Sequence, residues 1–294
     1  MTPFIPDGAV SIADASYNRQ IRLALQGAGG TAKTWAATTF RNPIFISYDR
    51  GLSAHVGKSI PELPFYNNTY IEKLSPRKSP IYLDIRTNEQ KPRPFDKKGA
   101  LLKFLYGDAL KLTGEQTLVL DGNTGVQAAF HSCYWADPAV DNNGKIKPFA
   151  EWGRKIDYYT EIMMCLKALQ CDVVFIFHES PDRDDEGRLN GKVRPLLSGG
   201  YADEISKEFT DWFRCHAVAK PTKEEQQKFC EKYQINTATL MEWLKSTPED
   251  HRSLYLWQTY ADSLCMGKTS LINPPKFIPA NYDSYCKYQR KISQ

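Results

Sequence analysis

The chain has 294 residues, of which 41% are apolar and 24% charged, enough for one large α/β domain or two small ones. Lys and Arg number 38 against 34 Asp and Glu, an excess too small to indicate a nucleic-acid-binding protein by itself. The seven cysteines are scattered without a C-x-x-C pair, as in reduced intracellular proteins. With no signal-peptide pattern and no run of about 18 apolar residues, we expect a soluble cytoplasmic protein without a membrane partner.

A glycine-rich loop, GAGGTAKT, occupies residues 27–34. It nearly matches the phosphate-binding pattern G-x-x-x-x-G-K-[ST], with alanine in place of the second glycine. Residues 21–26 favour a strand and residues 33–40 favour a helix, whose free N–H groups would face an anion. The alternative is a glycine-rich turn that happens to precede Lys-Thr. The predicted ATP-binding residues are Gly27, Ala28, Gly29, Gly30, Thr31, Ala32, Lys33, Thr34 and Trp35.

Three residues of this loop have specific expectations. Lys33 is expected to contact the β- and γ-phosphates, and Thr34 to ligate Mg²⁺. Ala32 falls at the expected entry to the helix, where a negative φ would make its methyl group tolerable. Because alanine is the better helix former, Ala32→Gly should leave nucleotide binding nearly unchanged and weaken the start of the helix.

Three later apolar segments are predicted to be strands that end in polar residues, as in open α/β sheets that bind ligands at this edge. These segments are 43–49 with Asp49, 116–122 with Asp121, and 172–179 with His178 and Glu179. Asp121 ends its strand, as the carboxylate of a Walker B strand does, and could hold a Mg²⁺-bound water. His178 could instead be a core histidine. A zinc site on His178 and Glu179 lacks further ligands at a suitable spacing.

The order of these elements resembles the core of RecA-type ATPases and, more closely, of phage single-strand-annealing ATPases and related phage nucleotide-binding proteins. The resemblance covers roughly residues 20–215 and 253–280. It rests on GAGGTAKT, FISYDRG, TLVLDGNT, VVFIFHES and KVRPLLSGGYADEISKEFTDWF. It implies a single α/β domain over residues 1–294, in which helices sandwich a mostly parallel sheet, with ATP and Mg²⁺ as cofactors.

The resemblance also implies roles for individual residues. Asp49 occupies the place of the acidic residue that activates water, usually a glutamate, and His178 that of a polar γ-phosphate sensor. RecA-like oligomers bind ATP between subunits, and the neighbour supplies a cation. Lys268 follows a predicted strand at 253–259 and resembles that cation in position. The alternative is an exposed lysine in a turn.

Several basic segments of the sequence could bind a nucleic acid. Residues 72–103 hold nine basic and four acidic side chains, which fits a DNA backbone or a solvated face. Residues 131–155 mix cations with aromatic rings, as unpaired bases require, and resemble the first DNA-binding loop of RecA-like cores. A second, mobile loop would span residues 180–194, where opposite charges balance. The predicted DNA contacts are Lys145, Lys147, Trp152, Arg154, Lys155, Arg188, Lys192 and Arg194.

Two further segments are set apart. Residues 220–252 read as a small helical insertion of two helices, with a capping box at Thr222 and Glu225. These helices could resemble a helix-turn-helix or only pack on the core. Residues 274–294 form a basic, aromatic C-terminal tail that could bind DNA or join subunits.

The function that the resemblance implies is a DNA-stimulated ATPase that binds single-stranded DNA and promotes annealing or strand exchange in phage recombination. It would act in the host cytoplasm as a homo-oligomeric filament or ring, and a single-strand-binding protein is a candidate partner. One alternative is a nucleotide-gated scaffold that recruits replication or recombination partners with little ATP turnover. Another is a P-loop small-molecule kinase with Arg183 and Arg188 as its lid arginines.

Overall fold

The computed structural model describes residues 20–52, 59–147, 149–184, 186–197, 201–263 and 265–289. Within these residues, nine strands form one sheet. Its strands are β1 (Arg22–Gly27), β2 (Pro43–Ser47), β3 (Glu62–Pro64), β6 (Thr117–Asp121), β7 (Asp172–Arg183), β8 (Leu189–Pro195), β9 (Asp211–Ala219), β10 (Ser253–Gln258) and β11 (Phe277–Pro279). A separate hairpin consists of β4 (Ile81–Asp84) and β5 (Glu89–Pro92).

The sheet is mostly parallel, as the sequence predicted. Its order is β11-β10-β9-β1-β7-β6-β2-β3, with β8 beside β7. The central strands β9, β1, β7, β6, β2 and β3 are parallel, and β8, β10 and β11 join in antiparallel pairs. The carboxyl ends of β1, β2, β6 and β7 therefore meet at one edge, which is where open α/β sheets bind ligands.

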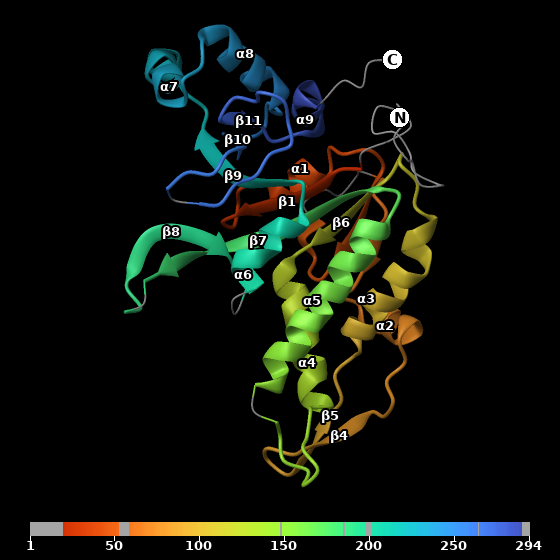
Figure 1. Ribbon diagram of the computed structural model, residues 1–294. Coiled ribbons are helices and arrows are strands. Elements are labelled where there is room, and N and C mark those ends of the chain that lie inside the picture. The colour runs from red at the N-terminus through yellow and green to blue at the C-terminus, as the bar shows by residue number, and fades with distance from the viewer. Residues whose placement is uncertain are drawn as a thin grey trace, which may run out of the picture.

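Helices cover both faces of the sheet (Figure 1). They are α1 (Lys33–Ala37), α2 (Asn68–Leu74), α3 (Lys97–Tyr106), α4 (Asn123–Ala136), α5 (Ala150–Ala168), α6 (Tyr201–Glu204), α7 (Gln226–Tyr233), α8 (Thr237–Ser246) and α9 (Tyr282–Tyr288), with 3-10 turns at Asp108–Lys111, Ile205–Glu208 and Lys223–Glu225. Alternate strand residues face opposite layers. Phe175 and Phe177 share a core with α3, α4 and α5, whereas Val174 and Ile176 share one with α1 and α9. No described helix is both long and apolar enough to cross a membrane.

The two helices predicted between residues 220 and 252 are present as α7 and α8. The capping box of Thr222 and Glu225 is formed before α7. Phe229, Leu240 and Trp243 pack against two leucines of β10 in a core of their own. The apolar faces of the insertion are therefore occupied by packing on the sheet.

Two segments differ from their predicted form. The expected mobile loop at 180–194 is a β-hairpin, because β7 continues to Arg183 and pairs with β8, and this hairpin projects from the sheet (Figure 1). The predicted C-terminal tail is packed over its described part, through residue 289, in β11 and α9. The hydroxyl of Tyr285 is buried and donates to Asp211 Oδ2 over 2.7 Å. Residues 290–294 lie outside the described residues.

Candidate active site

The glycine-rich loop joins β1 to α1 at the carboxyl edge of the sheet. Its tip, residues 28–30, is exposed, and α1 begins at Lys33. The ammonium group of Lys33 donates to the carbonyl oxygens of Gly27 over 2.8 Å and Ala28 over 2.7 Å. The residue is 6% exposed, and this burial lowers the pKa of Lys33. The loop thus holds a buried cation against its own carbonyl groups, where a phosphate could replace them.

Ala32 contradicts the expectation from the sequence. Its φ is 56° and its ψ is 32°, so the loop enters α1 through a left-handed residue rather than one with a negative φ. This conformation costs an L-amino acid about 1–2 kcal/mol, whereas glycine adopts it freely. The usual second glycine of the pattern therefore has a conformational role here, and Ala32 is strained.

Ala32→Gly should raise the free energy of unfolding by about 1 kcal/mol, since it relieves this strain. Urea unfolding of the two proteins would measure the difference. Ala36→Gly is the matched control, because Ala36 is buried within α1 and should lose about 1 kcal/mol or more of stability. A less stable Ala32→Gly protein would show that the original expectation, and not the left-handed geometry, describes this position.

Thr34 and Asp121 meet beneath the loop. The Thr34 hydroxyl donates to Asp121 Oδ2 over 3.0 Å. Burial, opposed by this hydrogen bond and aided by the nearby carboxylate of Asp49, raises the pKa of Asp121 to about 6. A hydroxyl and a carboxylate are oxygen donors of the kind that Mg²⁺ prefers, and a cation would offset the cost of ionising Asp121. The pair therefore fits the predicted metal-binding role, with Asp121 at the end of β6 as a Walker B carboxylate.

Asp121 should make stability depend on pH in the protein without nucleotide and metal. Because its pKa is raised from 3.8 to about 6, the folded state holds the proton more tightly, and stability falls as the pH rises through this window. The free energy of unfolding of Asp121→Asn should therefore exceed that of the parent by on the order of 2 kcal/mol at about pH 7. At about pH 4 the two proteins should be equally stable. Urea unfolding across this range tests it, with Asp108→Asn on the exposed surface as control. Parallel pH profiles for the parent and Asp121→Asn would contradict the assignment.

Asp49 lies two residues beyond the end of β2 and is exposed. Its Oδ1 accepts a hydrogen bond from the Gly51 N–H over 2.8 Å. A Cβ placed on Gly51 would lie 2.9 Å from Asp49 Oδ1 and 3.8 Å from Asp121 Oδ2, so the two carboxylates flank the same point. The structure thus brings Asp49 beside the Thr34–Asp121 pair, and its role in positioning water stays a prediction.

His178 pairs with Gly27 on the strand next to the loop. Burial, together with the charge of Lys33, lowers the pKa of His178, so the imidazole is neutral at pH 7 and could donate a hydrogen bond to a phosphate. Glu179 beside it forms a two-point ion pair with Arg214, at 3.0 and 3.1 Å. Among the described residues, no group of three or more His, Cys, Asp or Glu side chains could hold a metal, so the zinc alternative has no support.

Two residues near the site were missed from the sequence. Glu62, at the start of β3, contributes to the raised pKa of Asp121, and its Oε1 is buried without a hydrogen-bond partner. Arg214 reaches the site from β9, beside Gln26 of β1. Neither residue is adjacent to a recognisable motif. The rule that a sheet edge gathers residues from neighbouring strands could have indicated Arg214 once the strand order was known.

The comparison with protein families gives the class of this domain. Residues 19–237 match the family model AAA_24, described as an AAA domain. The chain belongs to this family. A search of curated proteins gave no match. The AAA domain of this chain contains the phosphate loop, Asp49, Asp121 and His178, and the family consists of P-loop ATPases, which supports nucleotide and Mg²⁺ as ligands of the residues that meet here.

In this AAA protein, the side chains of Trp35 and Lys268 do not join the other predicted site residues at the loop. The Trp35 ring packs against His251 at 5.4 Å and Tyr255 at 5.8 Å, so its side chain is engaged with the segment around β10. Lys268 Nζ donates to the Phe209 carbonyl over 2.7 Å, beside the start of β9, whereas the loop follows the end of β1. Lys268 is therefore distant from the loop of its own chain, and a contact with a neighbouring subunit's loop stays a prediction.

The predicted DNA contacts lie in two separate places. Lys145, Lys147, Trp152 and Arg154 are exposed at the connection of α4 and α5 and in the first turn of α5. Lys155 conflicts with its expected role. It is 2% exposed, and its ammonium lies 4.4 Å from the centre of the Trp152 ring, because it faces inward on α5.

The other three predicted DNA contacts are on the β7–β8 hairpin. Arg188 pairs with Asp184 and Glu186, and Arg194 lies 3.5 Å from Asp182. Lys192 is exposed on β8. Most of the positive charge on this hairpin is therefore balanced within it, in agreement with the balance noted from the sequence.

Proposed function

We propose that this AAA protein is an ATP-dependent single-stranded-DNA-binding protein that promotes annealing or strand exchange in phage recombination. The observation that carries the ATPase part is the Thr34–Asp121 hydrogen bond beneath a loop that holds Lys33. The DNA part rests on the resemblance to phage annealing ATPases and on the exposed cations and Trp152 at the connection of α4 and α5. The two parts are tested separately.

The proposed chemistry assigns one task to each residue of the site. Lys33 holds positive charge against the β- and γ-phosphates, and Thr34 with Asp121 holds Mg²⁺. ATP with Mg²⁺ supplies the phosphoryl group and part of the charge neutralisation. Asp49 orients a water molecule and accepts its proton, and the neutral His178 hydrogen-bonds the terminal phosphate.

We further propose a homo-oligomer, a filament or a ring, with ATP at the subunit interfaces. In this arrangement Lys268 would reach the loop of the neighbouring subunit, after releasing the Phe209 carbonyl that it contacts within its own chain. A cation at that position would neutralise charge on the γ-phosphate.

A nucleotide-gated scaffold with little turnover is the second candidate. Two properties of Asp49 favour this candidate, because both would slow hydrolysis. Its side chain is one methylene shorter than the usual glutamate, and its Oδ1 already accepts a hydrogen bond from the Gly51 N–H. A small-molecule kinase is less well supported, because its two candidate lid arginines are bound within their own hairpin. Arg183 donates to the Gly187 carbonyl, and Arg188 pairs with acids beside it.

The discriminating experiment is the rate of ATP hydrolysis with and without single-stranded DNA. We expect a rate that DNA raises, together with DNA affinity that depends on ATP. The scaffold predicts ATP affinity without stimulated hydrolysis, and the kinase predicts no effect of DNA. Lys33→Ala measured in parallel corrects for contaminating ATPases.

A further inference from the structure

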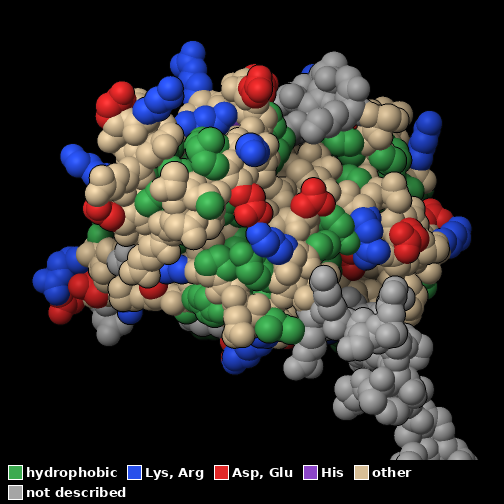
Figure 2. Space-filling model, turned by 90° about the horizontal axis from the view of Figure 1, so that it is seen from above, with side chains coloured by type: hydrophobic (Ala, Val, Ile, Leu, Met, Phe, Trp, Pro, Cys, Tyr) green, Lys and Arg blue, Asp and Glu red, His purple; other side chains and the backbone are tan. Residues whose placement is uncertain are grey.

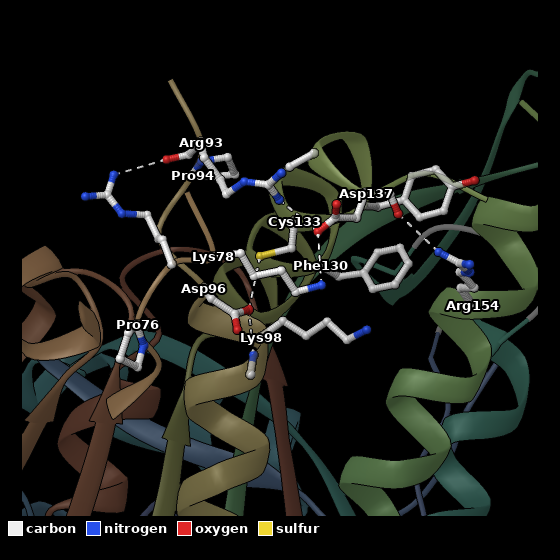
Figure 3. A pocket seen from close by; sticks show the side chains of 14 residues that line it. Pro76, Lys78, Arg93, Pro94, Asp96, Lys98, Phe130, Cys133, Asp137 and Arg154 are labelled. Atoms are coloured by element: carbon white, nitrogen blue, oxygen red, sulfur yellow. Dashed lines mark hydrogen bonds and ion pairs between the residues drawn. The ribbon is translucent and has the colours of Figure 1, made fainter. Parts of the chain in front are cut away.

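A pocket of about 330 Å³ lies away from the phosphate loop (Figure 3). Three stretches of the chain form it: the segment 76–99 before and within α3, the last turns of α4, and Arg154 of α5. In Figure 1 this region lies at the lower ends of α4 and α5, near the β4–β5 hairpin, whereas β1 and α1 lie in the upper part of the view. The pocket thus joins the two basic segments that the sequence presented separately.

The lining of the pocket carries more positive than negative charge. Its cations are Arg77, Lys78, Arg93, Lys98 and Arg154, and its carboxylates are Asp96 and Asp137. Asp96 is engaged as the cap of α3, since it accepts from the Gly99 N–H over 2.9 Å and from Ser75 over 2.7 Å. Asp137 pairs with Arg93 at 2.8 Å and lies 3.9 Å from Lys78. Arg77 is already paired with Glu72, which lies outside the lining, at 2.8 Å. The other four cations therefore share one carboxylate, Asp137, because Asp96 is engaged as the cap of α3.

Several donors of these cations remain available to a ligand. The ammonium of Lys98 lies 5.7 Å from the Phe130 ring and 5.4 Å from the Tyr158 ring, and no described acid lies within 4 Å of it. The Lys78 side chain is 82% exposed. The Lys98 ammonium and the exposed Lys78 side chain could therefore donate charge-assisted hydrogen bonds to an anion in the pocket.

We propose that this pocket binds a phosphate group of a nucleic-acid strand. A strand fits better than a small anion, because the positive surface continues outside the pocket. Outside the lining, residues 72–103 hold five further basic and three further acidic side chains, and exposed Lys145 and Lys147 lie on the connection that follows α4. The face seen in Figure 2 instead mixes blue and red side chains. This inference rests on the proposed DNA binding and adds where the strand is held.

The test is the salt dependence of binding to a fluorescein-labelled oligothymidine, measured by anisotropy. In Lys78→Gln/Lys98→Gln, the loss of two phosphate contacts should reduce the salt slope by about 1.4, because each contact with a single strand contributes about 0.7. Between about 50 and 200 mM salt, the parent should therefore lose about sevenfold more affinity than the variant. Glutamine keeps most of the lysine stem, so packing on Phe130 should persist. ATP-analogue binding and thermal unfolding should match the parent.

Lys228→Gln/Lys245→Gln is the matched control, since both lysines are exposed on the helical insertion and removing them changes the net charge equally. If this control lowers the slope as much as the pocket variant, or if the pocket variant binds as the parent does, the pocket is not the site, although the parent still binds DNA. If the parent binds no DNA with ATP present, the proposed function and this inference fail together. Inorganic phosphate should compete weakly, and competition as strong as that of the oligonucleotide would overturn the assignment to a strand.

Discussion

Lys33→Ala should abolish ATP binding. The ammonium is the cation that the loop holds in its interior, with hydrogen bonds to Gly27 and Ala28 that a phosphate would replace. Hydrogen bonds to charged groups contribute about 1.5–3 kcal/mol each, so losing two should weaken binding by about 10²–10⁴-fold. Titration of a fluorescent ATP analogue measures this change.

The control for this experiment has to separate the loss of the Lys33 charge from the loss of its buried side-chain stem. Lys33 is 6% exposed, so Lys33→Ala also removes a buried stem. Lys33→Met keeps an apolar stem without the charge and should bind ATP as poorly as Lys33→Ala, while thermal unfolding reports whether either variant is folded. Parental affinity in a folded Lys33→Met protein would refute the assignment of the phosphate loop.

Asp49→Asn should retain ATP binding and lose turnover. An amide can still accept the hydrogen bond from Gly51 but cannot take a proton from water, and a general base typically contributes about 10²–10⁴-fold. Single-turnover hydrolysis of ATP, with binding measured on the same sample, separates the two effects. Asp49→Glu restores the length usual in RecA-like cores and should hydrolyse ATP at least as fast as the parent.

Glu62→Gln is the informative comparison for Asp49→Asn. Glu62 lies close enough to raise the pKa of Asp121 and has an unpartnered buried oxygen, so it is the other carboxylate that could serve as a base. Hydrolysis at the parental rate in Asp49→Asn, with loss in Glu62→Gln, would move the base to Glu62. Glu179 is a weaker candidate, since Arg214 holds both of its oxygens.

The sequence predicted the central strands and the residues at their ends because buried strands are apolar runs with a polar end at the ligand edge. Asp121 and His178 were placed at this edge in this way, and Gly27 and Thr34 were placed by the phosphate-loop pattern. Their roles stay predictions. The φ of Ala32 could not be predicted, since it depends on the direction in which the loop enters α1. A motif with alanine at this position gives no indication of that angle.

The burial of individual side chains and the pairing of distant strands also could not be predicted from the sequence. The mixture of cations and aromatic rings in residues 131–155 predicts a DNA contact for Lys155, but α5 turns this side chain toward the core. Glu62 comes near Asp121 because β3 pairs with β2, and a strand of three residues gives almost no periodic signal. The hairpin at 180–194 looked like a loop, because its mixed charges and glycines concealed the alternation.

The projecting β7–β8 hairpin has a consequence for solubility. In the described structure, β8 pairs with β7 and meets the rest of the chain in one bridge, between Val193 and Cys265. Most of its outer edge therefore presents backbone groups that another chain could pair with, and Leu189 is 62% exposed. Edge strands avoid such pairing by carrying charged side chains. Lys192 and Arg194 are placed to do so, and replacing them with threonine would expose the strand to self-association.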